Sequence, residues 1–141
     1  MKKLLFILTV LISSNAGAFD HKTLLKTDLS WDGKKVEYLA TDAEISAISI
    51  KIKPSEAMPF HCHLTPSFGQ IISGNLQVEK MNGEKKIFKK GDVVVEVVNT
   101  WHRGRNLSDK KDVEILAFYA GSNGVENTIF YNEENKNKCS Q

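Results

Sequence analysis

The sequence predicts an all-β fold, either a sandwich or a barrel. Short runs rich in β-branched and aromatic residues recur after residue 30, with turns about every 8–12 residues. No segment sustains a helical stripe of apolar side chains. A length of 141 residues and an apolar content of 41% suit one domain with a core of its own.

Residues 1–18 are predicted to be a bacterial signal peptide that is cleaved after Ala18. Lys2 and Lys3 precede a short apolar run, and small residues lead up to the cleavage site. The run is too short for a membrane-spanning helix, which needs roughly 20 residues. We therefore expect a secreted or periplasmic protein whose mature form does not contact the membrane.

Several segments of the mature chain are predicted to be strands. In one of them, Ile48, Ile50 and Ile52 alternate with polar residues, which predicts one buried face. Asn82-Gly83 is typical of a hairpin turn. The strands are expected at Val36–Ala40, Ile45–Ile52, Met58–His63, Phe68–Ile72, Leu76–Lys80, Ile87–Phe88, Asp92–Val98, Val113–Tyr119 and Asn127–Tyr131.

The domain is expected to span residues 19–131. It would begin with a loosely ordered lead-in over residues 19–30 and be followed by a polar, frayed tail over residues 132–141. Export would allow a disulfide. Nothing in the spacing of Cys62 and Cys139 requires one, so we expect two unpaired thiols and keep the disulfide as the less favoured alternative.

The charge balance argues against nucleic acid as a partner. The formal net charge of +2 comes from Lys2 and Lys3, and the rest of the chain carries 17 basic and 17 acidic side chains. Such a chain has no electrostatic footprint for nucleic acid or an anionic membrane. A small-molecule ligand is the expected partner.

Three of the four histidines stand where a metal site can form. His61 and His63 are two residues apart on a predicted strand, so they project from one face while Cys62 projects from the other. His102 follows a long apolar strand. Imidazole is a good ligand for Zn, Cu, Fe and Ni. Taken alone, the His-x-His pair is as well explained by a chance pair on the surface.

Here the sequence resembles the cupin superfamily, and most of all small single-domain cupins. The resemblance covers residues 45–120. These residues fit the two cupin motifs at the family's spacing: His61, His63, Gly74, Gly91, His102 and Asn106.

The resemblance implies a double-stranded β-helix, or jelly-roll barrel, with a pocket at one end. In that pattern His61, His63 and His102 bind one divalent transition metal ion (Zn, Fe, Mn, Ni or Cu). It also implies pairing of two copies into a homodimer through sheet edges.

The sequence departs from the cupin pattern at the family's acidic ligand. Ser67 stands where the family has Glu, and Asn99 stands in place of a turn glycine, which predicts a left-handed backbone there. Glu96 lies within an apolar strand, where a charge should be paired or metal-bound. We expect Glu96 to serve as a fourth ligand or a catalytic acid/base; the alternative is an outward position paired with Arg103 or Arg105.

Three more residues are candidates for binding a substrate. Gln70 is on the strand that leaves the first motif, Trp101 precedes His102, and Arg103 suits an anionic group. The simpler explanation is packing for Trp101 and solvation for Arg103.

The function expected is that of an exported cupin metalloprotein with a small-molecule substrate, acting as an oxygenase, isomerase or hydrolase. The alternatives are a binding module without turnover and a cupin whose histidines bind nothing, because the fold does not decide between them.

Overall fold

The computed structural model describes residues 20–139, and the predicted all-β fold is confirmed over this range. The predicted signal peptide lies outside the described residues. The strands are β1 (Ala43–Ile52), β2 (His61–Cys62), β3 (Ser67–Ser73), β4 (Asn75–Lys80), β5 (Lys85–Lys89), β6 (Val93–Val95), β7 (His102–Asn106), β8 (Val113–Ser122) and β9 (Ile129–Phe130).

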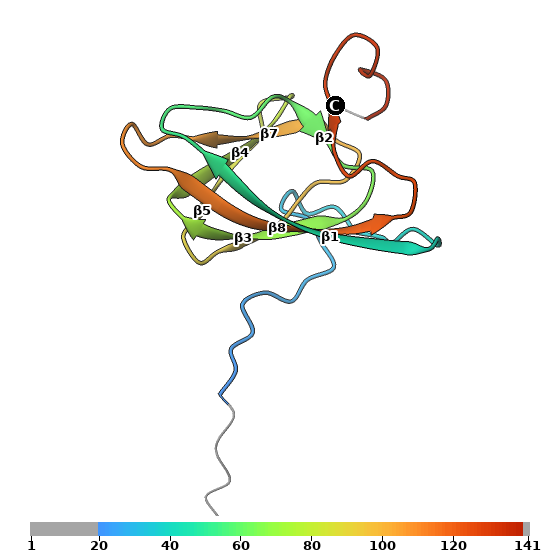
Figure 1. Ribbon diagram of the computed structural model, residues 1–141, viewed down its shortest axis with the longest axis horizontal. Helices are drawn as coiled ribbons and strands as arrows, with labels where there is room; N and C mark the ends of the chain where they lie inside the picture. The colour runs from blue at the N-terminus through green and yellow to red at the C-terminus, as the bar shows by residue number, and fades with distance from the viewer. Residues whose placement is uncertain (1–19, 140–141) are drawn as a thin grey trace, which may run out of the picture.

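The strands form two antiparallel sheets that face each other as a jelly roll (Figure 1). One sheet has the order β1-β8-β3-β6 and the other the order β5-β4-β7-β2-β9. In Figure 1 the layer with β2, β4 and β7 lies opposite the layer with β1, β3 and β8. Sequence neighbours are often in different sheets, so the two motifs that carry the histidines can meet.

The main core lies between the two sheets. Burying each of its valine, leucine, isoleucine and phenylalanine side chains contributes about 1.5–3 kcal/mol. Four core side chains, Leu76, Val94, Ile115 and Ala117, also line the cavity described below, so the core forms the floor of that cavity. The buried cluster consists of Ile52, Ile71, Leu76, Val78, Phe88, Val94, Val113, Ile115 and Ala117.

The buried face predicted for β1 is only partly buried. Ile52 is 3% exposed and belongs to the core, whereas Ile48 is 41% exposed. The physical reason is the cavity: Ile48 and Ile50 both line it, and of the two only Ile50 also packs against the core. The alternation of apolar and polar side chains therefore marks one inward face of β1, and this face borders the cavity as well as the core.

Other strand predictions were corrected. Residues 36–40 form no strand, and before them only the bridge between Leu29 and Lys35 is present in the described lead-in. The predicted strand Asp92–Val98 shortens to β6. Strand β7 was not predicted, because its buried positions are filled by His102, Gly104 and Asn106 rather than by apolar side chains.

The turns agree with the expectations for special backbone conformations. Asn99 has a φ of 53°, as its place in the second motif predicted. Gly74, with a φ of 75°, connects β3 to β4, and an added Cβ there would lie 2.7 Å from the Asp112 carbonyl oxygen. Gly83 donates its N–H to the Lys80 carbonyl in the predicted hairpin between β4 and β5.

The expectation of unpaired cysteines is wrong. Cys62 and Cys139 form a disulfide, with their Cα atoms 6.5 Å apart. Because side chains alternate along a strand, Cys62 lies on the outer face of β2, opposite to the histidines. A series of turns after residue 131 brings Cys139, at the end of the C-terminal segment (residues 132–139), back to that face. This segment is therefore held to the barrel and is not frayed.

Within the part of the chain that the structure describes, no helix has the length and apolarity needed to cross a bilayer.

Candidate metal centre

The three histidines meet inside the barrel. His61 in β2 pairs directly with His102 in β7, and His63 is bridged to Val98 just before that strand. One nitrogen from each ring lies within 4.8 Å of the nitrogens of the other two. All three side chains are buried, with exposures of 5% for His61, 3% for His63 and 1% for His102.

Backbone carbonyls fix the orientation of each ring. The Nδ1 atom of His61 lies 2.9 Å from the Pro59 oxygen. The Nδ1 atoms of His63 and His102 lie 2.7 Å and 2.8 Å from the oxygens of Asn127 and Thr100. A carbonyl oxygen only accepts, so each Nδ1 carries a proton and donates it. This tautomer leaves the Nε2 lone pair of every ring free to bind a metal.

The rings are also kept neutral. Burial lowers the pKa of His61, and burial together with the neighbouring His61 lowers the pKa of His63 to about 4. The pKa of His102 is lowered strongly by burial and then by the other two rings. Neutral imidazole is the form that binds metal, so protons compete weakly for this site at neutral pH.

The donor set fits a divalent transition metal ion. Three imidazole nitrogens suit Zn, Cu, Fe and Ni, and three protein ligands leave at least one position for water or a substrate. The Nε2 atom of His102 is buried and has no hydrogen-bond partner. A buried nitrogen without a partner is costly unless something binds it, and a metal ion would satisfy it.

Glu96 lies beside the histidines and inside the barrel. Its Oε2 is 3.6 Å from His102 Nε2. The side chain is 19% exposed as a whole, but Oε2 itself is buried and lacks a hydrogen-bond partner. Burial raises the pKa of Glu96 to about 7, against a smaller lowering by the Trp31 indole N–H. The outward alternative is wrong: Glu96 lines the cavity, and Arg103 pairs with Glu79.

Glu96 adjoins the ligand cluster without being part of it. The group of mutually close ligand atoms found in the described chain contains the three histidines and not Glu96. A carboxyl group with a pKa near neutrality gains and loses a proton readily at pH ~7, as a general acid or base requires.

A cavity of about 180 Å³ adjoins the histidines between the two sheets. Its walls are mostly apolar, and its polar side chains besides the histidines are Glu96, Ser67, Thr128 and Tyr119. Ser67 is 3% exposed, and its Oγ has no hydrogen-bond partner. Apolar lining comes from both sheets: Ile48, Ile50, Met58, Phe68, Leu76, Val94, Ile115, Ala117 and Phe130.

The residues predicted to bind a substrate are not among those that line this cavity. Gln70 points toward the Gly91 carbonyl, with 3.5 Å between donor and acceptor. Trp101 is fully buried on the outer side of β7, where it packs edge-on against Tyr131. Arg103 pairs with Glu79 and lies over the Phe60 ring. For Trp101 the simpler explanation, packing, describes its surroundings.

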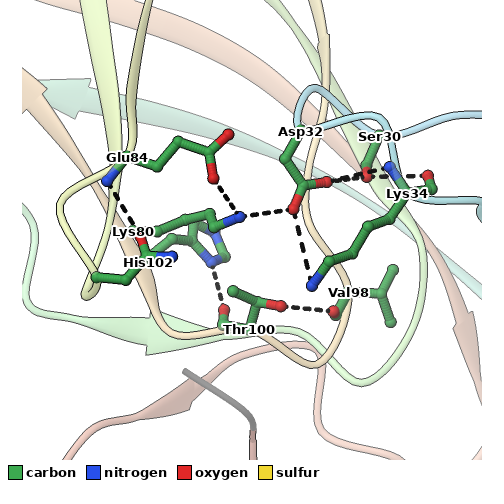
Figure 2. A network of polar contacts seen from close by, with 9 residues as sticks. Ser30, Asp32, Lys34, Lys80, Glu84, Val98, Thr100 and His102 are labelled. Atoms are coloured by element: carbon green, nitrogen blue, oxygen red, sulfur yellow. Dashed lines mark hydrogen bonds and ion pairs between the residues drawn. The ribbon is translucent and has the colours of Figure 1, made fainter.

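Sequence reasoning missed a buried ion pair beside the site (Figure 2). Lys80 lies opposite His102 in the β4–β7 pairing, and its Nζ lies 2.8 Å from Asp32 and 2.6 Å from Glu84. Burial alone would raise the pKa of Asp32 and lower that of Lys80. Their mutual interactions, together with the hydrogen bonds of Asp32 to Ser30 and of Lys80 to Glu84, outweigh burial, so the pKa of Asp32 is lowered and that of Lys80 is raised.

The ion pair holds the loop that carries Trp31. The Lys80 ammonium lies 5.6 Å from the centre of the Trp31 ring, and the backbone N–H of Trp31 donates to the Val95 carbonyl. Trp31 thereby reaches the neighbourhood of Glu96. The only signal in the sequence was a turn at Asp32-Gly33, which does not reveal a partner 48 residues away.

Comparisons with known proteins agree with this architecture. A family described as "Cupin domain" matches residues 49–119, which is half of the chain. No curated protein matches the chain significantly.

Solved structures share the fold at low sequence identity. A DMSP lyase from Ruegeria pomeroyi has a TM-score of 0.53 and 17% identity over 64% of this chain and 44% of its own. An oxalate decarboxylase from Lactobacillus farciminis has a TM-score of 0.54 and 23% identity, and the match covers 64% of this chain and 27% of its own. A Cupin 2 conserved barrel domain protein from Salinispora arenicola has a TM-score of 0.50 and 17% identity, and the match covers 61% of this chain and 71% of its own. The chain spans less than half of the first two proteins, and these similarities show the fold alone.

Proposed function

This chain belongs to the cupin domain family, and from that premise we propose that it binds one divalent transition metal ion through His61, His63 and His102. One observation carries the proposal: three buried, neutral rings each donate Nδ1–H to a carbonyl oxygen, and one nitrogen of each ring lies within 4.8 Å of those of the other two. A chance cluster would not need the same tautomer three times. The metal, when bound, would supply Lewis-acid activation of a bound oxygen.

We further propose that the cavity binds a small, mostly apolar molecule that reaches the metal through one polar group. A dry apolar cavity of about 150 Å³ is large enough for benzene, and the cavity here is about 180 Å³. No lysine or arginine is among the described residues that line it. A negative group on the ligand would therefore be neutralised at the metal site and not by a basic side chain.

The reaction we propose is a metal-assisted conversion of this molecule, with Glu96 as proton donor or acceptor. Glu96 is close to His102 and its pKa is about 7, which suits general acid–base catalysis. This covers the oxygenase, isomerase and hydrolase classes, which share the need for an open metal position.

A second candidate function is binding without turnover. It is favoured by Ser67, whose hydroxyl replaces the carboxylate that the cupin pattern places next to the histidines. A barrel with this change can hold a metal and a ligand in place without reaction, and turnover with Glu96→Gln as the control would separate the two functions.

Export of the protein to an oxidising compartment is also part of the proposal. The sequence of residues 1–18 supports it. The Cys62–Cys139 disulfide supports it independently, because disulfides persist in secreted and periplasmic proteins and are rare in the cytosol.

Metal analysis of the mature protein, purified without a polyhistidine tag, tests the proposal. We expect one metal ion per chain in the wild type and loss of it in His61→Ala and His102→Ala. His21→Ala is the matched control, because His21 lies in the lead-in and not in the cluster, and it should keep the metal. Equal metal in all four proteins would refute the site.

A further inference from the structure

The C-terminal segment forms a loop that projects from the barrel beside β2 (Figure 1), and it is fixed to the outer side of the ligand-bearing strands at a few points. Its last described residue, Cys139, is bonded to Cys62, which stands between His61 and His63 in the sequence. The Trp101 indole N–H, next to His102, donates to the Lys136 carbonyl at 3.2 Å. The segment thus touches the immediate neighbour of each ligand.

These outer contacts are packed like a core. Cys62 and Trp101 are 0% exposed, and Cys139 is 7% exposed. Together with Ile129 they form a buried cluster separate from the main core. Because interiors are close-packed, such a cluster transmits a displacement of one member to the others.

Strand β2 is short, and part of its support comes from its outer side. It is two residues long, and the structure pairs it with β7 through one register pair and with β9 through two. A two-residue strand gains little from its own hydrogen bonds, so its position depends on packing from the outside. The disulfide supplies that packing covalently.

The support continues along the chain from β9. The Asn127 carbonyl, just before β9, accepts the Nδ1–H of His63. After β9, Tyr131 N–H donates to the Phe60 carbonyl, next to His61. The stretch from Asn127 to Cys139 therefore contacts the histidine-bearing strand at its start, along its length and, through Cys62, on its outer face.

We propose that the disulfide-anchored C-terminal segment positions the metal centre, with Cys62, Cys139 and Trp101 as positioning residues. The inference rests on the proposed function. Held from outside, β2 and β7 keep the three Nε2 atoms close together before a metal ion arrives. Without the anchor, the segment and β2 can shift, and metal binding must then bear the cost of bringing the rings together.

The redox state of the disulfide consequently sets the metal affinity. A dithiol reductant breaks the Cys62–Cys139 bond: each sulfur gains one electron and one proton, and the dithiol closes to its own disulfide. Outer partners of metal ligands typically change metal affinity 10–100-fold, and we expect a loss of about that size.

The test is the zinc dissociation constant, measured in competition with a coloured chelator. It compares the oxidised mature protein, the protein reduced by a dithiol that is then removed anaerobically, and the Cys62→Ala/Cys139→Ala variant. We expect zinc binding to weaken at least 10-fold in the last two, with a changed visible spectrum of the cobalt-substituted protein. Trp101→Phe, which stays aromatic but loses the N–H that donates to Lys136 and part of the buried ring volume, should weaken binding by a smaller factor.

Phe88→Leu is the matched control. It removes packing from the main core, away from the cavity lining, and should lower thermal stability without changing zinc affinity. Equal affinity and equal cobalt spectra with and without the disulfide would overturn this inference alone. No zinc binding by the oxidised wild type would overturn the proposed function. If the double variant loses its near-ultraviolet circular dichroism, it has lost its tertiary packing. The zinc affinity of Trp101→Phe relative to wild type then decides whether the C-terminal segment positions the metal centre.

Discussion

At the scale of single residues, the role of each side chain in the site follows from its hydrogen-bond partner or from the lack of one. In His61, His63 and His102 the Nδ1–H donates to a backbone carbonyl oxygen, which leaves Nε2 as the nitrogen that can bind a metal. Glu96 stands next to them with a buried oxygen that no hydrogen bond satisfies. The difference between ligand and neighbour is testable residue by residue.

Glu96→Gln should leave metal binding nearly intact. Glu96 lies outside the group of mutually close ligand atoms, so we expect one zinc ion per chain and an affinity within about 10-fold of wild type, the lower edge of the effect of an outer partner. His63→Ala should weaken binding well beyond that. Zinc competition titrations measure both; an equally large loss in Glu96→Gln would make Glu96 a ligand.

Removing one partner of the buried Lys80–Asp32 pair should destabilise the fold strongly. The side chains are 6% and 1% exposed, and leaving one buried charge unpaired typically costs about 3–5 kcal/mol. We expect Asp32→Ala to lower the free energy of unfolding in urea by less than that, about 1–3 kcal/mol, because Lys80 Nζ keeps Glu84 as a partner at 2.6 Å.

Lys34→Ala serves as the control for the ion pair. The Lys34 side chain is 61% exposed, and its Nζ lies 3.9 Å from Asp32 Oδ2, which is a long distance for an ion pair. Exposed pairs of this kind contribute about 0–1 kcal/mol. Similar effects of Asp32→Ala and Lys34→Ala would show that burial does not strengthen the Lys80–Asp32 pair.

At the scale of elements, the connection from β6 to β7 decides where His102 and Glu96 point. Strand β6 ends at Val95, and Asn99 reverses the chain with a positive φ before β7 begins. The Asn99 N–H donates to the His63 carbonyl at 2.7 Å, which ties this turn to the strand with the other two histidines.

Asn99→Gly should be neutral or slightly stabilising, whereas Asn99→Val should be destabilising. A β-branched residue in the left-handed region is strained, at a cost of roughly 1–2 kcal/mol per residue, while Gly enters it freely. Thermal unfolding of the metal-free proteins measures the difference. If valine were tolerated as well as glycine, the backbone at this turn would not be left-handed.

At the scale of the whole molecule, the metal-free barrel keeps three neutral histidines in its interior, and its stability must depend on pH. The pKa values of all three are lowered in the folded state, that of His63 to about 4. Between about pH 6.5 and 4 the three histidines bind more protons in the unfolded chain than in the folded one, which lowers stability as the pH falls. Glu96, whose pKa burial raises to about 7, opposes this by at most one proton, so the histidines determine the sign.

The expected loss has a defined window. Each histidine contributes a slope of up to about 1.4 kcal/mol per pH unit between its folded and unfolded pKa values. Urea unfolding from pH 7.5 to 4.5 should show this decline in the metal-free wild type and a smaller one in His63→Ala. A stability that is constant through pH 6 would contradict the burial of neutral rings.

The all-β class was predictable from local patterns, and the histidine trio from the resemblance to the two cupin motifs. Alternation, turn residues and the spacing of His61, His63 and His102 are all visible along the chain. The disulfide, the Lys80–Asp32 pair and the approach of Trp31 to Glu96 were not, since each joins residues far apart in sequence through packing. Strand β7 was missed because its inward positions hold site residues in place of apolar ones.

The most direct test of the central claim is X-ray absorption at the zinc edge of the loaded, oxidised protein. The account predicts a first shell with three imidazole nitrogens, at the Zn–N distance of about 2.0–2.1 Å, completed by oxygen. A shell containing sulfur, or fewer than three imidazoles, would contradict it.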